Sequence, residues 1–386
     1  MLPTIDITNV VLRSSPEYQL ILYDHLPSHE QQALVDLLND PNFYGILRHK
    51  NSTSVSMKAV NRDTALLFLT LMQEAVLPRY VVNDWSESSL QSVISLILDG
   101  ILQMKVGNEY LSGQKAYQYI YNHDVQMLSN NHIGNLSLNA LKYAQHLAIN
   151  DLTRLSARIY FYNRIPVSAY WKALLPDLAS VRKFLEFETS ARTSLSRWVE
   201  VRQRNSQDWI VWSHPNRKPR SEKPRYTFKL YISSHPESLP KILPDAIEIL
   251  LKTDSQSFKV GADVYGLLRP DKFVAYFWSL DSLNDAAQLL VKALDGVSIH
   301  GTPFTCEIGL NGLLSWGVDP PQDTQLISWQ ERESWRLWLT NRLASYMLSH
   351  PENHGEETWL YALNRLRTEN VDPIQWTPLS LDFGDK

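Results

Sequence analysis

The sequence predicts an α+β fold, with a mainly helical N-terminal half and a C-terminal mixed β-sheet with packed helices. First, the chain of 386 residues is long enough for two domains. Second, apolar residues recur at helical spacing through the first half, whereas short strands and helices follow one another in the second. Third, a basic, proline-rich run at residues 213–225 separates the halves. We therefore expect one domain at residues 1–212 and another at residues 226–386.

The composition excludes several classes of partner and site. The formal net charge of −4, with 20% charged residues, gives no general attraction to nucleic acid or to an anionic membrane. Cys306 is the only cysteine, which excludes an intrachain disulfide and a cysteine-based metal site and fits a reducing compartment. The first residues lack a signal-peptide pattern, and the apolar stretch Thr64–Met72 is too short to cross a bilayer. We expect a cytoplasmic protein, or one exported by a route without such a signal, and no membrane partner.

Residues 44–113 have the order of elements of a winged-helix-like unit. Such a unit can be purely structural, can add a peptide as a strand at the edge of its wing, or can place a helix in a DNA groove. No Lys or Arg lies between Ser86 and Met104, so the cations that phosphate contacts require are missing and nucleic acid is not an expected partner. The predicted elements are strands Tyr44–Arg48 and Val55–Val60, a helix that begins at Arg62, a helix at Ser88–Gly100 and a hairpin around Gly107-Asn108.

The middle of the chain is predicted to be helical and to end in the basic run. Helices are expected at residues 136–149, 168–185 and 186–201, and residues 157–163 are expected to form a strand or a β-like connection. Between Arg192 and Lys229, ten Lys or Arg residues stand against three acidic residues. The run at residues 213–225 is either a solvated hinge or a rim that collects phosphate groups.

The C-terminal half alternates strands with helices. Residues 226–233 alternate in polarity, which places Lys229 and Tyr231 on the same face of a strand. The last two helices carry tryptophan and leucine residues that we interpret as core. The predicted elements are a helix at Leu243–Lys252, strands at Phe258–Val260 and Lys272–Trp278, a helix at 281–294, a strand at Phe304–Leu310, and helices at 330–347 and 357–367.

Three stretches of this half resemble the HopA-type effector and phosphothreonine-lyase-like family, over about residues 220–315. They are KPRYTFKLYISS, the FKV at Phe258–Val260 and the RPDKFVAY at Arg269–Tyr276. The N-terminal half is similar to free-standing members from bacterial peptide-modification clusters, at residues 62–65 and 98–102. The resemblance implies β-elimination of phosphate from phosphoserine or phosphothreonine, which leaves a dehydroamino acid. It implies no metal or cofactor, and its partners are a phosphorylated, leader-bearing precursor peptide and a separate peptide kinase of class V lanthipeptide type.

The resemblance also implies roles for two lysines. In phosphothreonine lyases a strand carries a lysine and a histidine one residue apart, and a second lysine acts as the base. Lys229 matches the first lysine and Lys259 the second, whereas Tyr231 stands where the histidine acid would be. A free lysine has a pKa near ~10.4, so Lys259 needs a downward shift of roughly 3 units to act as a base at neutral pH. Burial beside Lys229 would act in that direction.

The remaining roles concern the departing phosphate. We assign Lys229, Arg269 and Arg225 to phosphate binding, because a guanidinium can donate to two phosphate oxygens at once. Tyr231 or His235 would donate a proton. The alternative function is a non-catalytic phosphopeptide- or protein-binding module of the same family, which keeps the basic pocket but lacks the acid.

Overall fold

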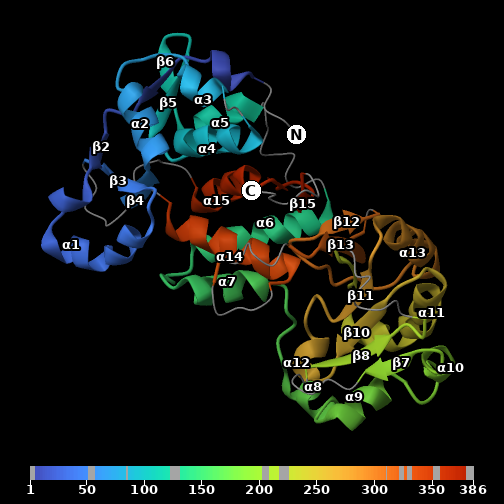
Figure 1. Ribbon diagram of the computed structural model, residues 1–386. Helices are drawn as coiled ribbons and strands as arrows, with labels where there is room; N and C mark the ends of the chain where they lie inside the picture. The colour runs from blue at the N-terminus through green and yellow to red at the C-terminus, as the bar shows by residue number, and fades with distance from the viewer. Residues whose placement is uncertain are drawn as a thin grey trace. The chain divides into compact units, whose positions relative to one another are not determined.

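The fold is α+β, as the sequence predicts, and the described strands form four antiparallel sheets (Figure 1). Contacts within the chain define two compact units, residues 1–125 with 345–370 and residues 126–344 with 371–386. The predicted domain boundary at 213–225 falls within the second unit's range and stays a prediction. No helix among the described residues has both the length and the apolar character needed to cross a membrane. The computed structural model describes residues 5–50, 57–83, 86–121, 131–201, 208–216, 226–309, 311–320, 326–327, 333–350 and 357–379.

The first unit contains two three-stranded sheets and six helices. Its strands are β1 (Leu12–Ser14), β5 (Leu102–Val106) and β6 (Glu109–Leu111) in one sheet, and β2 (Tyr18–Ile21), β3 (Phe43–His49) and β4 (Met57–Asn61) in the other. Its helices are α1 (Ser28–Ala33), α2 (Arg62–Thr70), α3 (Arg79–Asn83), α4 (Glu87–Leu98), α5 (Gly113–Tyr121) and α15 (Thr358–Thr368). The strands and helices expected in residues 44–113 are present among the described residues, except that Val55 and Ser56 of the second expected strand lie outside them. The assignment to the winged-helix class stays a prediction.

A buried carboxylate ties helix α15 to the rest of the first unit. Asp99, at the end of α4, accepts a hydrogen bond of 2.8 Å from the Tyr361 hydroxyl and forms an ion pair of 3.2 Å with Arg365. Lys58 on β4 forms a second ion pair with the same carboxylate. Burial by itself raises the pKa of Asp99, but the charges of Lys58 and Arg365 outweigh it and hold the pKa below its usual value.

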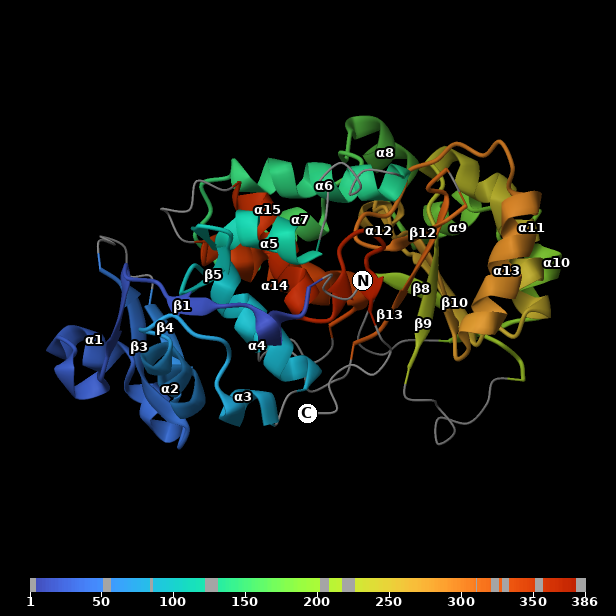
Figure 2. The same ribbon diagram turned by 90° about the horizontal axis from the view of Figure 1, so that it is seen from above.

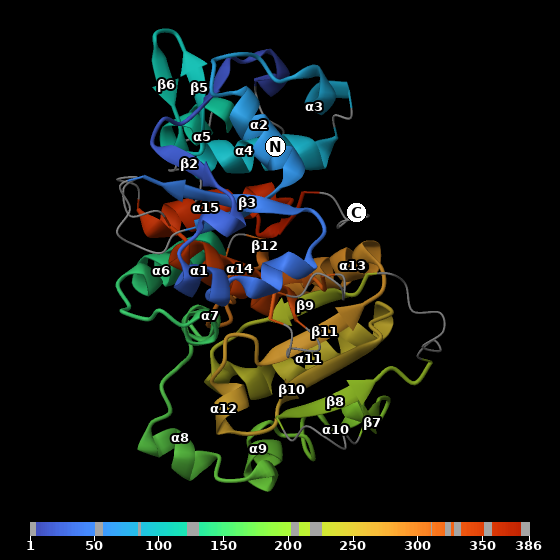
Figure 3. The same ribbon diagram turned by 60° about the vertical axis from the view of Figure 1, so that its left-hand side comes forward.

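The second unit is built on a seven-stranded antiparallel sheet, in the order β12-β13-β9-β11-β10-β8-β7. Figure 3 shows β9, β11, β10 and β8 following one another across this sheet. The strands are β7 (Val199–Val201), β8 (Trp209–Ser213), β9 (Phe228–Ile232), β10 (Ser257–Gly261), β11 (Phe273–Phe277), β12 (Cys306–Ile308) and β13 (Leu314–Val318), and the pair β14 (Val371–Asp372) and β15 (Thr377–Pro378) forms a small separate sheet. The helices are α6 (His132–Gln145), α7 (Leu152–Tyr160), α8 (Ala169–Leu174), α9 (Leu178–Phe184), α10 (Arg192–Leu195), α11 (Leu239–Lys252), α12 (Val264–Leu267), α13 (Leu280–Ala293) and most of α14 (Trp335–Leu348).

The two faces of this sheet differ in chemistry. The alternating register places Leu230, Phe258 and Ala275 on one face, and each is completely buried. Helix α13 packs on β9 and β11, and α11 lies beside α13 (Figure 2). The opposite face carries Lys229 and Tyr231, as the period of two predicts. All five residues of β9 are buried, so neither face of this strand is exposed to water. The alternation of its residues therefore separates an apolar core on one face from a buried polar layer on the other.

Four predictions about the second unit are wrong. Residues 168–185 form two helices, α8 and α9, instead of one, because Pro176 between them cannot continue the first. The sheet was expected to be mixed, but every described pairing is antiparallel, because β11 lies between β9 and β10 and separates these two parallel strands. Residues 157–160 end helix α7 instead of forming a strand, since Leu155 and Ile159 are buried at helical spacing. Residues 186–201 do not form one helix, because the chain turns after α10 and pairs β7 with β8.

We predict that Asp99→Asn lowers the free energy of unfolding by about 3–5 kcal/mol, because Lys58 and Arg365 would be left as buried or half-buried charges without their carboxylate. The loss should be largest at neutral pH. An aspartate whose folded-state pKa is lowered stabilises the fold above its unfolded-state pKa, and this contribution disappears as the pH falls through the folded-state value. Chemical denaturation at several pH values measures both effects. The exposed variant Asp36→Asn serves as the control, and equal stability of the two variants would contradict the prediction.

Candidate active site

Two lysines from different strands lie on the polar face of the seven-stranded sheet, on either side of one aromatic ring. Tyr276 on β11 is the register partner of Lys229 on β9, and Val274 on the same face of β11 is the partner of Lys259 on β10. The Lys229 Nζ lies 5.6 Å and the Lys259 Nζ 5.8 Å from the centroid of the Tyr276 ring. The structure therefore brings together the two lysines that the sequence singles out.

Arg269 joins this pair through a second aromatic ring. It lies in the turn between α12 and β11, and its Cζ is 5.1 Å from the centroid of the Trp209 ring. The Lys259 Nζ is 3.9 Å from the same centroid. Both cations thus lie against the ring of Trp209 on β8. Three of the sequence-predicted site residues, Lys229, Lys259 and Arg269, occupy one region beside the sheet.

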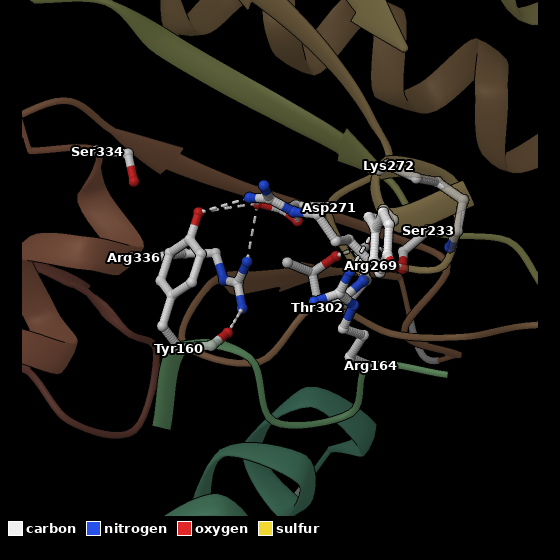
Figure 4. A network of polar contacts seen from close by, with 12 residues as sticks. Tyr160, Arg164, Ser233, Arg269, Asp271, Lys272, Thr302, Ser334 and Arg336 are labelled. Carbon is white, nitrogen blue, oxygen red and sulfur yellow. Dashed lines mark hydrogen bonds and ion pairs between the residues drawn. The ribbon is translucent and has the colours of Figure 1, made fainter. Parts of the chain in front are cut away.

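The Asp271 carboxylate and its partners hold the Arg269 guanidinium in place (Figure 4). Arg269 donates to both oxygens of Asp271 at 2.8 Å, and Arg336 of α14 forms an ion pair of 3.0 Å with the same carboxylate. The Tyr160 hydroxyl accepts from Arg269 at 2.9 Å and donates to Asp271 at 3.1 Å. Burial raises the pKa of Asp271, but Arg269 and Arg336 outweigh burial and hold the pKa far below its usual range.

The charges in this region do not cancel. Lys229 forms an ion pair with Asp319, which follows β13 and is about one-third exposed. Asp319 pairs with Lys229, and Asp271 pairs with both Arg269 and Arg336, so these three cations exceed their two carboxylates by one positive charge. Lys259 adds a further charge when it is protonated. An anion such as a phosphate monoester would balance positive charge of this kind.

The surroundings of Lys259 favour its neutral form. Burial and then the charge of Lys229 lower the pKa of the Lys259 ammonium to about 7, and Arg269 adds to this effect. Asp271 and Asp319 act in the opposite direction. A large fraction of Lys259 is therefore an uncharged amine at neutral pH and is able to accept a proton.

The two predicted proton donors lie in different places. Tyr231 is buried next to Lys229 on β9, and burial raises the pKa of its phenol well above the usual value, so the hydroxyl stays protonated. His235 lies after β9, where its imidazole is 3.7 Å from the Glu237 carboxylate and its ring centroid is 6.5 Å from that of His300. The described contacts of His235 include none of the three cations. Arg225 lies outside the described residues, and the role of each of these residues stays a prediction.

The sequence allows Arg269 to pair with Asp271, two residues later, across a turn, and the structure shows this pair. Sequence reasoning missed other members of this region. Tyr160 was missed because its segment was read as β-like, and Arg336 because α14 was read only as core. A signal existed for Arg336, since it is a charged residue that directly follows the buried Trp335 and precedes the buried Trp338. No group of His, Cys, Asp or Glu residues in the described part of the chain is arranged to hold a metal ion.

Comparison with known proteins finds similarity only at the level of solved structures. No family model and no curated protein matches the chain. An effector protein of Pseudomonas syringae pv. tomato strain DC3000 is 15% identical, with a TM-score of 0.39, and the match covers 66% of this chain and 99% of that one. The phosphothreonine lyase effector VirA (SpvC) of Chromobacterium violaceum is 15% identical, with a TM-score of 0.26 and coverage of 47% and 86%. The type III effector and phosphothreonine lyase OspF of Shigella flexneri is 16% identical, with a TM-score of 0.22 and coverage of 47% and 87%. These values are too low to carry an argument about the chemistry of this chain.

We predict that Asp319→Asn lowers the pKa of Lys259 below its value of about 7. The substitution removes a negative charge that favours the Lys259 ammonium and leaves the charge of Lys229 without its counter-ion. Reductive methylation with a carbon-13 label, followed by NMR across a pH series, reports the pKa of this amine. Asp245→Asn, an exposed change on α11, is the control. A Lys259 titration that is the same in both variants would refute the electrostatic coupling.

Proposed function

We propose that the chain is a lyase that removes phosphate by β-elimination from phosphoserine or phosphothreonine in a leader-bearing peptide, giving dehydroamino acids. The observation that carries this proposal is the position of Lys259. A lysine with a pKa of about 7 shares one face of the sheet with Lys229 and lies against the same Trp209 ring as Arg269. β-Elimination needs a base for the Cα proton and cations for the departing phosphate, and these residues supply both.

In the proposed reaction the neutral Lys259 amine accepts the Cα proton of the substrate residue. The electrons of the broken C–H bond form the Cα=Cβ double bond, and the Cβ–O bond breaks with its electrons passing to the phosphate. Lys229 and Arg269 bind the phosphate oxygens, and Arg225 contributes from the basic run. The Asp271 carboxylate occupies one edge of the Arg269 guanidinium, which leaves its Nη1 side for the phosphate.

The departing phosphate also requires a proton, because a dianionic monoester would otherwise leave with three negative charges. We assign this proton to Tyr231 or His235. Burial keeps the Tyr231 phenol protonated beside Lys229, which supports the tyrosine as a neutral hydrogen-bond donor. Lys229 would bind phosphate through the N–H donors of its ammonium that the ion pair with Asp319 does not use.

The partners follow from the same proposal. A separate peptide kinase would supply the phosphorylated precursor, and the winged-helix-like region at 44–113 would dock its leader segment. The basic run at 213–225 would collect the phosphorylated side chain before it reaches Lys229. The domains at 1–212 and 226–386 and a cytoplasmic location complete the proposal, which includes no metal or cofactor.

A second candidate function is a phosphopeptide- or protein-binding module without turnover. Two observations favour it. Tyr231 replaces the histidine that family members use as an acid, and both Lys229 and Arg269 are paired with carboxylates. Such a module would retain a positively charged site and bind phosphopeptide without cleaving the Cβ–O bond.

Mass spectrometry of a phosphorylated peptide incubated with the protein distinguishes the two functions. A lyase produces the dehydroamino acid, and its rate should rise with pH through about 7 as the Lys259 ammonium loses its proton. Lys259→Ala should lower kcat by about 10²- to 10⁴-fold, whereas Lys241→Ala, an exposed change on α11, should not. Retention of the phosphate by a peptide that binds supports the module. Equal rates for Lys259→Ala and wild type would exclude Lys259 as the base.

A further inference from the structure

A third lysine, buried beside the candidate active site, has no part in the proposed chemistry. Lys272 comes directly after Asp271 and its side chain is completely buried. Its Nζ donates to the Ser234 carbonyl at 2.8 Å and lies 2.8 Å from the Nδ1 of His300. A methionine would fill a similar volume without the cost of removing an ammonium from water. What a methionine cannot do is connect these two groups.

The hydrogen bonds of His300 define its protonation. Its Nε2 faces the Asn163 carbonyl, which only accepts, so Nε2 carries the proton and Nδ1 is the acceptor for Lys272. Asn163 in turn donates from its side chain to the carbonyls of His300 and Gly301 at 2.8 and 3.0 Å. His300 is therefore held on both sides and gives Lys272 a fixed anchor.

The segment 300–303 reaches three parts of the Asp271 network. His300 holds Lys272, and the Thr302 hydroxyl donates to the Pro270 carbonyl at 3.0 Å. The Pro303 carbonyl accepts from the Nε of Arg336 at 2.9 Å. Figure 4 shows Thr302, Lys272 and Arg336 around the turn that carries Arg269 and Asp271. This segment thus restrains both arginines that share the Asp271 carboxylate.

The turn itself is held from a further side. The Ser233 hydroxyl donates to the Pro270 carbonyl at 2.6 Å, and the backbone N–H of His300 donates to the Ser233 carbonyl at 2.8 Å. The Pro270 carbonyl therefore accepts hydrogen bonds from two hydroxyl groups. Lys272, which follows Asp271, has two hydrogen-bond partners of its own. The backbone of Arg269 and Asp271 cannot shift without breaking bonds that are buried from water.

We propose that Lys272 and His300 are positioning residues, which hold the Arg269–Asp271 turn in the geometry that binds the phosphate of the substrate. This inference rests on the proposed function only in the identity of the ligand. Lys272 and His300 do not touch the substrate. They act through Pro270, Asp271 and the 300–303 segment.

Binding of inorganic phosphate to the full chain, measured by calorimetry, tests the proposal without turnover. Lys272→Met should raise the Kd of phosphate, and the KM of a phosphopeptide, by about 10- to 100-fold, as expected for a misplaced binding group. The titration of the Lys259 amine should shift as well, because Asp271 and Arg269, which the displaced turn carries, both act on its pKa. Lys241→Met, the exposed control on α11, should leave the Kd as in the wild type.

Three further variants keep the test decisive if Lys272→Met does not fold. His300→Asn retains a side-chain acceptor for Lys272 and should bind phosphate within a few-fold of the wild type, whereas His300→Leu should not. Thr302→Val removes one donor to Pro270 and should weaken binding by a smaller factor. Folded His300→Leu and Thr302→Val proteins with the wild-type Kd would overturn the proposal. If the wild-type protein binds inorganic phosphate but does not eliminate phosphate from a phosphopeptide, the proposed lyase activity is refuted. The Kd values of the variants then still decide the positioning role.

Discussion

The buried carboxylate of Asp271 is the group on which the polar side of the seven-stranded sheet depends. It accepts hydrogen bonds from Arg269 and the Tyr160 hydroxyl and forms an ion pair with Arg336, and these residues come from a turn and two helices. Both guanidinium groups also lie near the Tyr160 ring, at 5.6 and 4.6 Å from its centroid. Two like charges so close together in a region of low dielectric constant would repel each other without a shared anion. Asp271 therefore allows these cations to gather at the place where the proposed reaction would bind phosphate.

The same arrangement sets the protonation of Lys259. Burial and neighbouring cations lower its pKa, whereas Asp271 and Asp319 limit the decrease. A proton acceptor must be neutral, but a phosphate site must be positive, so the two requirements oppose each other at a single lysine. The chain separates them in space. Lys229 and Arg269 carry the charge, and Trp209 and Tyr276 surround Lys259 with aromatic rings.

Rigidity on the other side of the sheet supports this polar layer. Phe258, Val260 and Phe273 are completely buried on the apolar face, and α13 packs on β9 and β11. Adjacent residues of a strand point to opposite faces, so packing that fixes Phe258 and Val260 also fixes Lys259 between them. Strand positions are therefore suited to a base that must stay within reach of one proton, and the 300–303 segment gives similar support to the turn that carries Arg269.

The sequence by itself determined the α+β class, most of the elements and the shared face of Lys229 and Tyr231, because these depend on periodicities within single segments. It misplaced Tyr160 and overlooked Arg336, since local composition does not show which residues a distant carboxylate attracts. Only the tertiary structure decided that β11 lies between β9 and β10, which places Lys259 near Lys229 across Tyr276. Pairing of distant strands and the pKa of a buried amine depend on contacts between segments far apart in the chain, and no local pattern encodes them.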